Sequence, residues 1–118
     1  MRTATVEILG EVHTLCLSTR AKLEIDERFG GLDKAFDSLK SEDQRVLLET
    51  TFGLLEIMMR AGSIYAKCTG GTMVKPLSAE EMFDLIGISE LPALVTALRD
   101  AIINGVKREV EVETSKNA

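Results

Sequence analysis

The chain is poor in aromatic residues and has no tryptophan, because its 118 residues include only four phenylalanines and one tyrosine. A folded core must therefore be built from aliphatic side chains, and hydrophobic residues do make up 45% of the sequence. Charged residues make up 28%, which is typical of a globular protein rather than a disordered chain. We expect one domain over residues 1–113, followed by a disordered polar tail over 114–118.

Histidine and cysteine are also scarce, with one of the former and two of the latter. Two cysteines do not make a disulfide framework, so we expect Cys16 to be buried and Cys68 to be exposed beside a glycine-rich loop. His13 has no second ligand at a suitable spacing, and we expect it on the surface or half-buried in a strand. Cys16 should point to the opposite face of that strand, which argues against a nucleophile pair. The sequence therefore predicts a non-enzymatic protein without a metal or cofactor.

An excess of positive charge and a long hydrophobic run are both absent. The net charge is −5 and the pI is about 4.9, which argues against nucleic acid as a main ligand. No run approaches the ~18 apolar residues of a membrane span, so we expect no membrane partner and a cytoplasmic protein. The stretch Gly70-Gly71-Thr72 leads into Pro76 instead of a Gly-Lys-Ser/Thr sequence, which indicates a connector rather than a phosphate loop.

Residues 5–18 contain two β-rich runs on either side of Gly10, which predicts a hairpin with Gly10 at a positive-φ turn position. Residues 110–113 alternate Val-Glu-Val-Glu, which is compatible with an edge strand beside the hairpin or with a fraying tail. The segments between have helical spacing, apart from a loop over 69–76. We therefore predict a mainly α fold with an N-terminal β-hairpin, which is α+β by strict count.

Helix-start and helix-stop signals divide the helical part. Helices are predicted over 20–29, ended by Gly30-Gly31, over 32–39, and over about 42–67. Ser41 with Gln44 fits a capping box for the long helix, and Ser78 with Glu81 fits a second box for a short helix. Ser89 is the predicted cap of a last helix that ends near Gly105, with Pro92 in its first turn.

The predicted long helix has an unusually broad apolar arc. Its polar strip is narrow and consists of Arg45, Glu49, Gly53, Glu56 and Arg60. An arc this wide needs cover on two sides, which the chain's own core or another copy can supply. Methionine adapts to varied partners, although simple core filling is the alternative. The candidate partner or oligomer interface consists of Met58, Met59, Ile64, Tyr65 and Met73.

Acidic residues gather after the glycine-rich loop. They stabilise helix N-termini, or they form a secondary acidic patch for a basic partner. The residues concerned are Glu80, Glu81, Asp84 and Glu90.

Several segments together resemble one protein family over nearly the full length. They are the hairpin around Gly10, Arg20-Ala21, and the stretches 27–32, 54–62, 101–105 and 108–113. With these, the chain resembles the tail assembly chaperones of long-tailed bacteriophages and prophages. The resemblance implies a mostly helical, self-associating, non-enzymatic protein that coats the tape measure protein until the tail tube protein polymerises around it.

The resemblance also implies the cytoplasm of an infected or lysogenic bacterial host, and absence from the mature virion. Many members of the family have a longer form made by translational frameshifting, which a protein sequence does not reveal. Two alternatives stay open at this point. One is another small phage morphogenesis protein, such as a tail completion or connector factor, and the other is a cytoplasmic helical adaptor.

Overall fold

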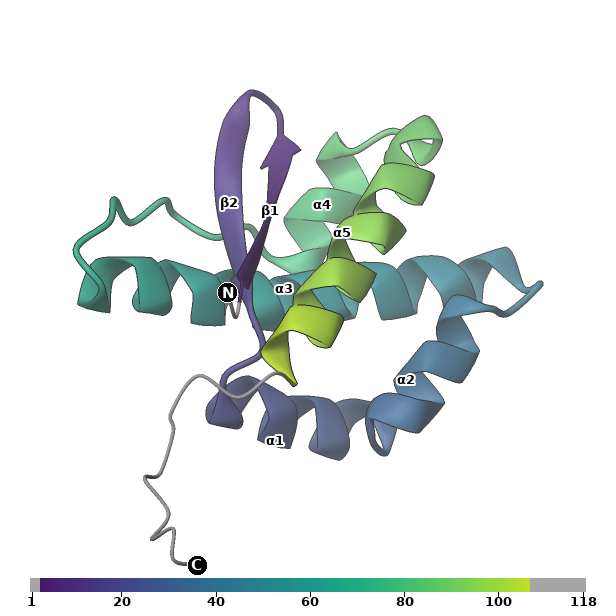
Figure 1. The fold of residues 1–118 in the computed structure, drawn as a ribbon. Helices are drawn as coiled ribbons and strands as arrows, with labels where there is room; N and C mark the ends of the chain where they lie inside the picture. The colour runs from purple at the N-terminus through teal and green to yellow at the C-terminus, as the bar shows by residue number, and fades with distance from the viewer. Residues whose placement is uncertain (1–2, 107–118) are drawn as a thin grey trace, which may run out of the picture.

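The computed structural model describes residues 3–106, in which a β-hairpin precedes five α-helices (Figure 1). The predicted mainly α fold with an N-terminal hairpin is confirmed, since 66% of these residues are helical. The predicted strand over 110–113 and the tail over 114–118 lie outside the described residues. The elements are β1 (Thr3–Ile8), β2 (Glu11–Cys16), α1 (Thr19–Phe29), α2 (Leu32–Leu39), α3 (Gln44–Cys68), α4 (Ala79–Leu85), the 3-10 turn η1 (Ile88–Glu90) and α5 (Leu91–Gly105).

The hairpin closes with a two-residue turn, Leu9-Gly10, between the paired residues Ile8 and Glu11. Both turn residues have positive φ, 53° for Leu9 and 84° for Gly10. This fits a type I′ turn, whose twist matches that of the flanking strands. The prediction for Gly10 is confirmed. A leucine in this backbone region is strained, and the conformation costs about 1–2 kcal/mol relative to the right-handed one.

Several predicted helix ends are confirmed. Gly30 ends α1 in the left-handed conformation, with φ of 82°. Ser78 and Glu81 form a reciprocal capping box at the start of α4, and Pro92 lies in the first turn of α5. These ends fix where the chain leaves one helix and enters the next.

Two predicted caps are wrong. Helix α3 is capped by Asp43, whose carboxylate accepts hydrogen bonds from the backbone N–H groups of Arg45 (3.0 Å) and Val46 (3.4 Å). The hydroxyl of Ser41 instead accepts from the N–H of Asp43, so it stabilises the turn before the helix. Ser89 is not a cap either, because it lies inside η1, which runs directly into α5 with Glu90 as the N-cap residue.

Helix α3 is the centre of the fold and contacts β2 and all four other α-helices (Figure 1). It approaches the hairpin closely at Gly62, where a Cβ atom would lie 1.7 Å from the backbone oxygen of Thr14. Only glycine permits this distance. The hairpin is therefore fixed across α3, with the turn at one end and Cys16 at the other.

The wide apolar arc of α3 is covered by the chain itself. Leu54, Leu55, Met58 and Met59 are all at most 1% exposed, and they belong to one core with side chains from the hairpin and the other helices. Leu55, in the middle of this arc, has no exposed surface. The arc consequently gives no physical reason to expect a second copy, and self-association stays a prediction from the family resemblance.

Candidate interaction groove

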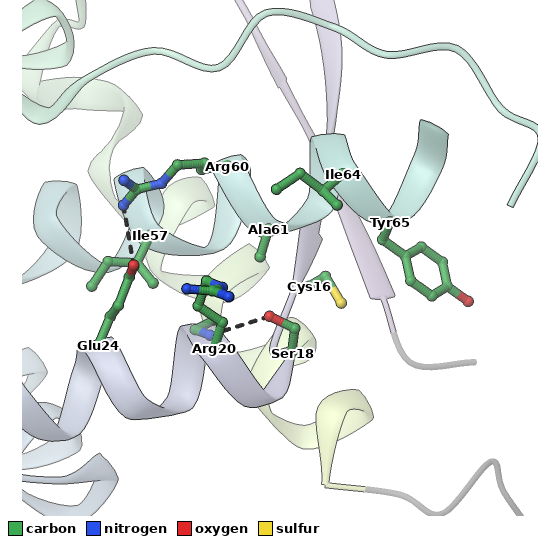
Figure 2. A pocket seen from close by; sticks show the side chains of 10 residues that line it. Cys16, Ser18, Arg20, Glu24, Ile57, Arg60, Ala61, Ile64 and Tyr65 are labelled. Atoms are coloured by element: carbon green, nitrogen blue, oxygen red, sulfur yellow. Dashed lines mark hydrogen bonds and ion pairs between the residues drawn. The ribbon is translucent and has the colours of Figure 1, made fainter. Parts of the chain in front are cut away.

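A groove of about 290 Å³ lies between α1, the second half of α3 and the end of β2 (Figure 2). The aliphatic residues of α3 that line it are Ile57, Ala61 and Ile64. These residues follow the i, i+4, i+7 spacing of one helix stripe, so they face the same way. The full lining is Cys16, Ser18, Arg20, Ala21, Glu24, Ile57, Arg60, Ala61, Ile64 and Tyr65.

The groove exists because of the small residues along it. Ala61 on α3 is half-buried and Ala21 on α1 is buried, so neither helix places a large side chain between them. Ile57 is buried at the bottom, while Ile64 is 51% exposed at the open end. Tyr65 is half-buried beside it. An aliphatic side chain from a partner would therefore contact apolar side chains on the α3 wall.

The rim of the groove is polar and carries both signs of charge. Arg60 on α3 forms an ion pair with Glu24 on α1, with an N···O distance of 3.2 Å (Figure 2). Arg20 lies exposed on the α1 side, and Ser18 caps that helix by accepting a hydrogen bond from the N–H of Ala21 at 3.1 Å. A partly exposed pair such as Arg60–Glu24 contributes at most about 1 kcal/mol, so it shapes the rim more than it stabilises the fold.

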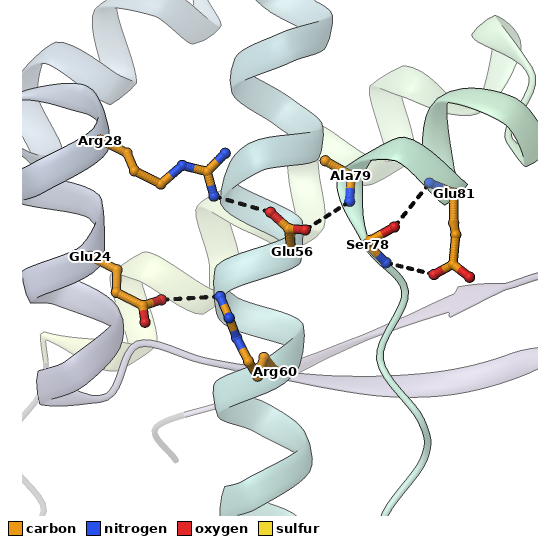
Figure 3. Close-up of polar contacts among 7 residues, drawn as sticks. All are labelled: Glu24, Arg28, Glu56, Arg60, Ser78, Ala79 and Glu81. Atoms are coloured by element: carbon orange, nitrogen blue, oxygen red, sulfur yellow. Dashed lines mark hydrogen bonds and ion pairs between the residues drawn. The ribbon is translucent and has the colours of Figure 1, made fainter.

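Three residues of the predicted polar strip of α3, namely Gly53, Glu56 and Arg60, contact α1. Arg28 pairs with Glu56 at 3.0 Å, and the other carboxylate oxygen of Glu56 accepts from the N–H of Ala79 at 3.1 Å (Figure 3). Glu56 thus links α1 to the start of α4. Gly53 lies against α1 as well, since a Cβ there would be 2.8 Å from Cζ of Phe29. These contacts set the spacing of α1 and α3 and hence the groove.

The structure corrects part of the predicted partner interface. Met58 and Met59 were expected to be exposed, but both are buried because the hairpin and neighbouring helices cover the arc from two sides. The sulfur of Met59 even accepts a hydrogen bond from the N–H of Leu77. A charge at Met59 would disrupt the core rather than remove a surface contact.

The other predicted interface residues are accessible, but they do not form one patch. Ile64 and Tyr65 line the groove. Met73 is exposed on the connector between α3 and α4 and does not line it. The spacing of Ile57, Ala61 and Ile64 was a usable sequence signal for the groove, whereas the contribution of Cys16 and α1 depended on the tertiary arrangement.

The four residues of the predicted acidic patch lie at different places on the surface. Glu80 lies near Arg45 and Glu49 of α3, whereas Glu90 lies by the hairpin turn. Glu81 serves in the capping box, and the hydrogen bond from the backbone N–H of Ser78 lowers the pKa of its carboxyl group. Asp84 is exposed on α4. The four acids are all accessible but do not converge on one point.

His13 lies in a strand as expected, but it is 2% exposed rather than at the surface or half-buried, so that part of the expectation is wrong. It pairs with Val6 across the hairpin, on the face opposite to the buried Cys16, as the odd spacing predicts. Within residues 3–106, no group of three or more His, Cys, Asp and Glu side chains is placed to hold a metal ion.

Comparisons with known proteins add no relatives. No protein-family model, curated protein or solved structure gives a significant match to this chain. Of the helices described here, none has the length and apolarity needed to cross a membrane.

Proposed function

We propose that this protein is a phage tail assembly chaperone that binds the helical tape measure protein through the groove between α1 and α3. The observation that carries the proposal is the apolar stripe of α3 that lines the groove, with Ile57 buried, Ala61 half-buried and Ile64 51% exposed. The sequence resemblance to that family is the second support for the proposal. The expected setting is the host cytoplasm before the tail tube protein polymerises, and the chaperone then leaves the tape measure protein.

The shape and chemistry of the groove suit this role. A helix in a groove is anchored by apolar side chains at i, i+3 or i+4, and i+7, which is the spacing the groove itself offers. A chaperone must also release its client. A long client with many such segments binds several copies of the chaperone at once, each through a weak contact. Each contact dissociates easily when tube subunits compete for the same segment.

Capture of the client tests the proposal directly. The chain is co-expressed with the tape measure protein encoded in the same phage genome, and the complex is isolated through a tag on the tape measure protein. Ile64→Asp is expected to reduce capture by at least about tenfold, since it places a charge where apolar contact is needed. Leu23→Asp is the matched control, because Leu23 is similarly exposed on α1 but does not line the groove.

Salt dependence and virion content distinguish the alternatives. Capture should survive an increase from about 50 to about 500 mM salt, because screening weakens exposed charge pairs far more than apolar contacts. A chaperone is absent from purified virions, whereas a tail completion or connector factor is present in them. Presence in the virion, or equal capture by wild type and Ile64→Asp, would contradict the proposal.

A further inference from the structure

A second groove, of about 300 Å³, lies at the turn end of the hairpin. Leu9 and Glu7 of the hairpin form one side, and Leu85, Ile86 and Glu90 form the other. The first groove touches the hairpin at Cys16, at the far end of β2. With a rise of ~3.3 Å per residue, the two ends of the hairpin are about 20 Å apart, so the two grooves are separate surfaces.

Exposed aliphatic side chains gather around this second groove. Leu9 and Leu85 both line it, and they are 65% and 53% exposed. Exposed apolar side chains brought together in one groove mark an interaction site more often than scattered single residues do.

Leu9 gives the strongest evidence that this surface has a function. It occupies a positive-φ turn position, where asparagine or glycine would be unstrained. Its side chain does not compensate by packing into the core, because it is mostly exposed. The turn needs this backbone conformation but not a leucine, and a strained residue at such a position is a reason to look for a function there.

The charged residues that line the groove are both acidic. Residues 3–19 and 76–98 contain six of the chain's 19 acidic residues and none of its 14 basic residues. Glu7 and Glu90 line the groove itself, and Glu11 and Asp84 are exposed on the same elements. Basic residues are instead concentrated on α1 to α3, where they form ion pairs such as Arg28–Glu56. A positively charged partner is therefore favoured here, and nucleic acids and anionic lipid surfaces are repelled.

We propose that the groove at the hairpin turn binds an amphipathic helix of another protein that carries Lys or Arg beside its apolar face. Aliphatic side chains of that helix contact Leu9, Leu85 and Ile86, and its basic residues pair with Glu7 and Glu90. The assignment is independent of the client groove between α1 and α3. It gives the protein a second binding surface with a different charge requirement.

Model peptides test the assignment. The probe is a fluorescent amphipathic Leu/Lys helix of about 14 residues, or about four turns, and the comparison is a Leu/Glu helix of the same pattern. Binding is measured by fluorescence anisotropy against the full chain. Leu9→Asn is expected to weaken binding of the Leu/Lys helix at least about tenfold. It should leave the melting temperature unchanged or raised, because Asn-Gly suits a type I′ turn.

Two further variants sharpen the result. Leu23→Asn removes a leucine of nearly equal exposure, 62%, from α1, and it should not affect binding. Glu90→Gln should weaken binding severalfold and reduce its salt dependence, since it removes one charge from the rim. Equal binding of both peptides, no binding of either, or equal weakening by Leu9→Asn and Leu23→Asn would overturn the proposal. Light scattering that shows Leu9→Asn dissociating an oligomer would also overturn it, because a second copy would then be the occupant.

Discussion

His13 is the chain's only histidine, and its ring lies in the core with 2% exposure. Neither ring nitrogen has a protein hydrogen-bond partner within the described residues. A small cavity of about 10 Å³ adjoins the ring, with Ser63, Thr72 and Val74 among the residues around it, and it is large enough for about one water molecule. Burial lowers the pKa of His13 below its ordinary value of about 6.5, and Glu11 opposes this shift only in part.

A lowered pKa in the folded state makes stability depend on pH in a defined direction. The unfolded chain binds a proton near pH 6.5, while the folded chain keeps the ring neutral to lower pH. The free energy of unfolding therefore has its highest value above pH 6.5. It decreases as the pH is lowered below 6.5, with a slope of at most about 1.4 kcal/mol per pH unit. Urea unfolding between about pH 7.5 and 5.5 measures this.

The control for His13 is a side chain that does not titrate. His13→Gln should lose most of the pH dependence in that window, because no other histidine is present and carboxyl groups titrate mainly at lower pH. If wild type and His13→Gln lost equal stability on acidification, the proton would be binding elsewhere.

At the scale of elements, the two glycines Gly53 and Gly62 of α3 should differ strongly in how much an alanine substitution destabilises the fold. Gly62→Ala places a methyl group 1.7 Å from a backbone oxygen of β2, and a hydrogen-bonded strand does not move aside. We expect a loss of more than about 3 kcal/mol in unfolding free energy, or failure to fold. Gly53→Ala meets the edge of the Phe29 ring at 2.8 Å, which a side-chain rotation relieves. It should cost only about 1 kcal/mol.

Chemical denaturation of the two variants measures this difference. Alanine has the higher helix propensity, so an isolated helix would gain about 1 kcal/mol from either change. Stabilisation by Gly62→Ala would therefore mean that β2 does not cross α3 at this residue. Stabilisation by Gly53→Ala would mean that α1 is held farther from α3 than the described contacts indicate.

The element pattern was largely predictable from local signals, and the close contacts were not. The hairpin turn, the stop at Gly30 and the Ser78–Glu81 box depend on neighbouring residues, and each was found in advance. The cap of α3 was placed two residues early because Ser41 and Asp43 are both good capping residues, and sequence alone does not decide between them. The role of Gly62 depends on a strand about 48 residues away, which no local pattern reveals.

At the scale of the whole molecule, the site was only partly predictable for a related reason. The broad apolar arc of α3 correctly indicated that other elements pack against this helix on two sides. The sequence did not show whether these elements belong to the same chain or to another copy. Burial of Met58 and Met59 shows that they belong to the same chain, and the accessible part of the predicted interface is Ile64 and Tyr65 in the groove and Met73 on the connector outside it. The groove at the hairpin turn was missed because it joins residues 7–9 to residues 85–94.

Because α3 contacts β2 and every other helix, residues 3–106 should unfold as one cooperative unit. Leu55 lies in the middle of α3 with no exposed surface. Leu55→Ala should lower the unfolding free energy by about 2–5 kcal/mol, through lost burial and the cavity left behind. Leu23→Ala, on exposed α1 surface, should change it by less than about 0.5 kcal/mol.

Two probes in one titration decide whether the loss is shared by the whole molecule. Far-ultraviolet circular dichroism follows the helices, and fluorescence of Tyr65, the only tyrosine, follows the groove end of α3. Both transitions should move together to lower urea in Leu55→Ala and keep the same slope, because the hairpin and the other helices have no core apart from α3. If the Tyr65 transition separated from the helical one, the groove would be able to open while the rest of the core stayed folded. The groove could then not act as a rigid, pre-formed site for a helical client.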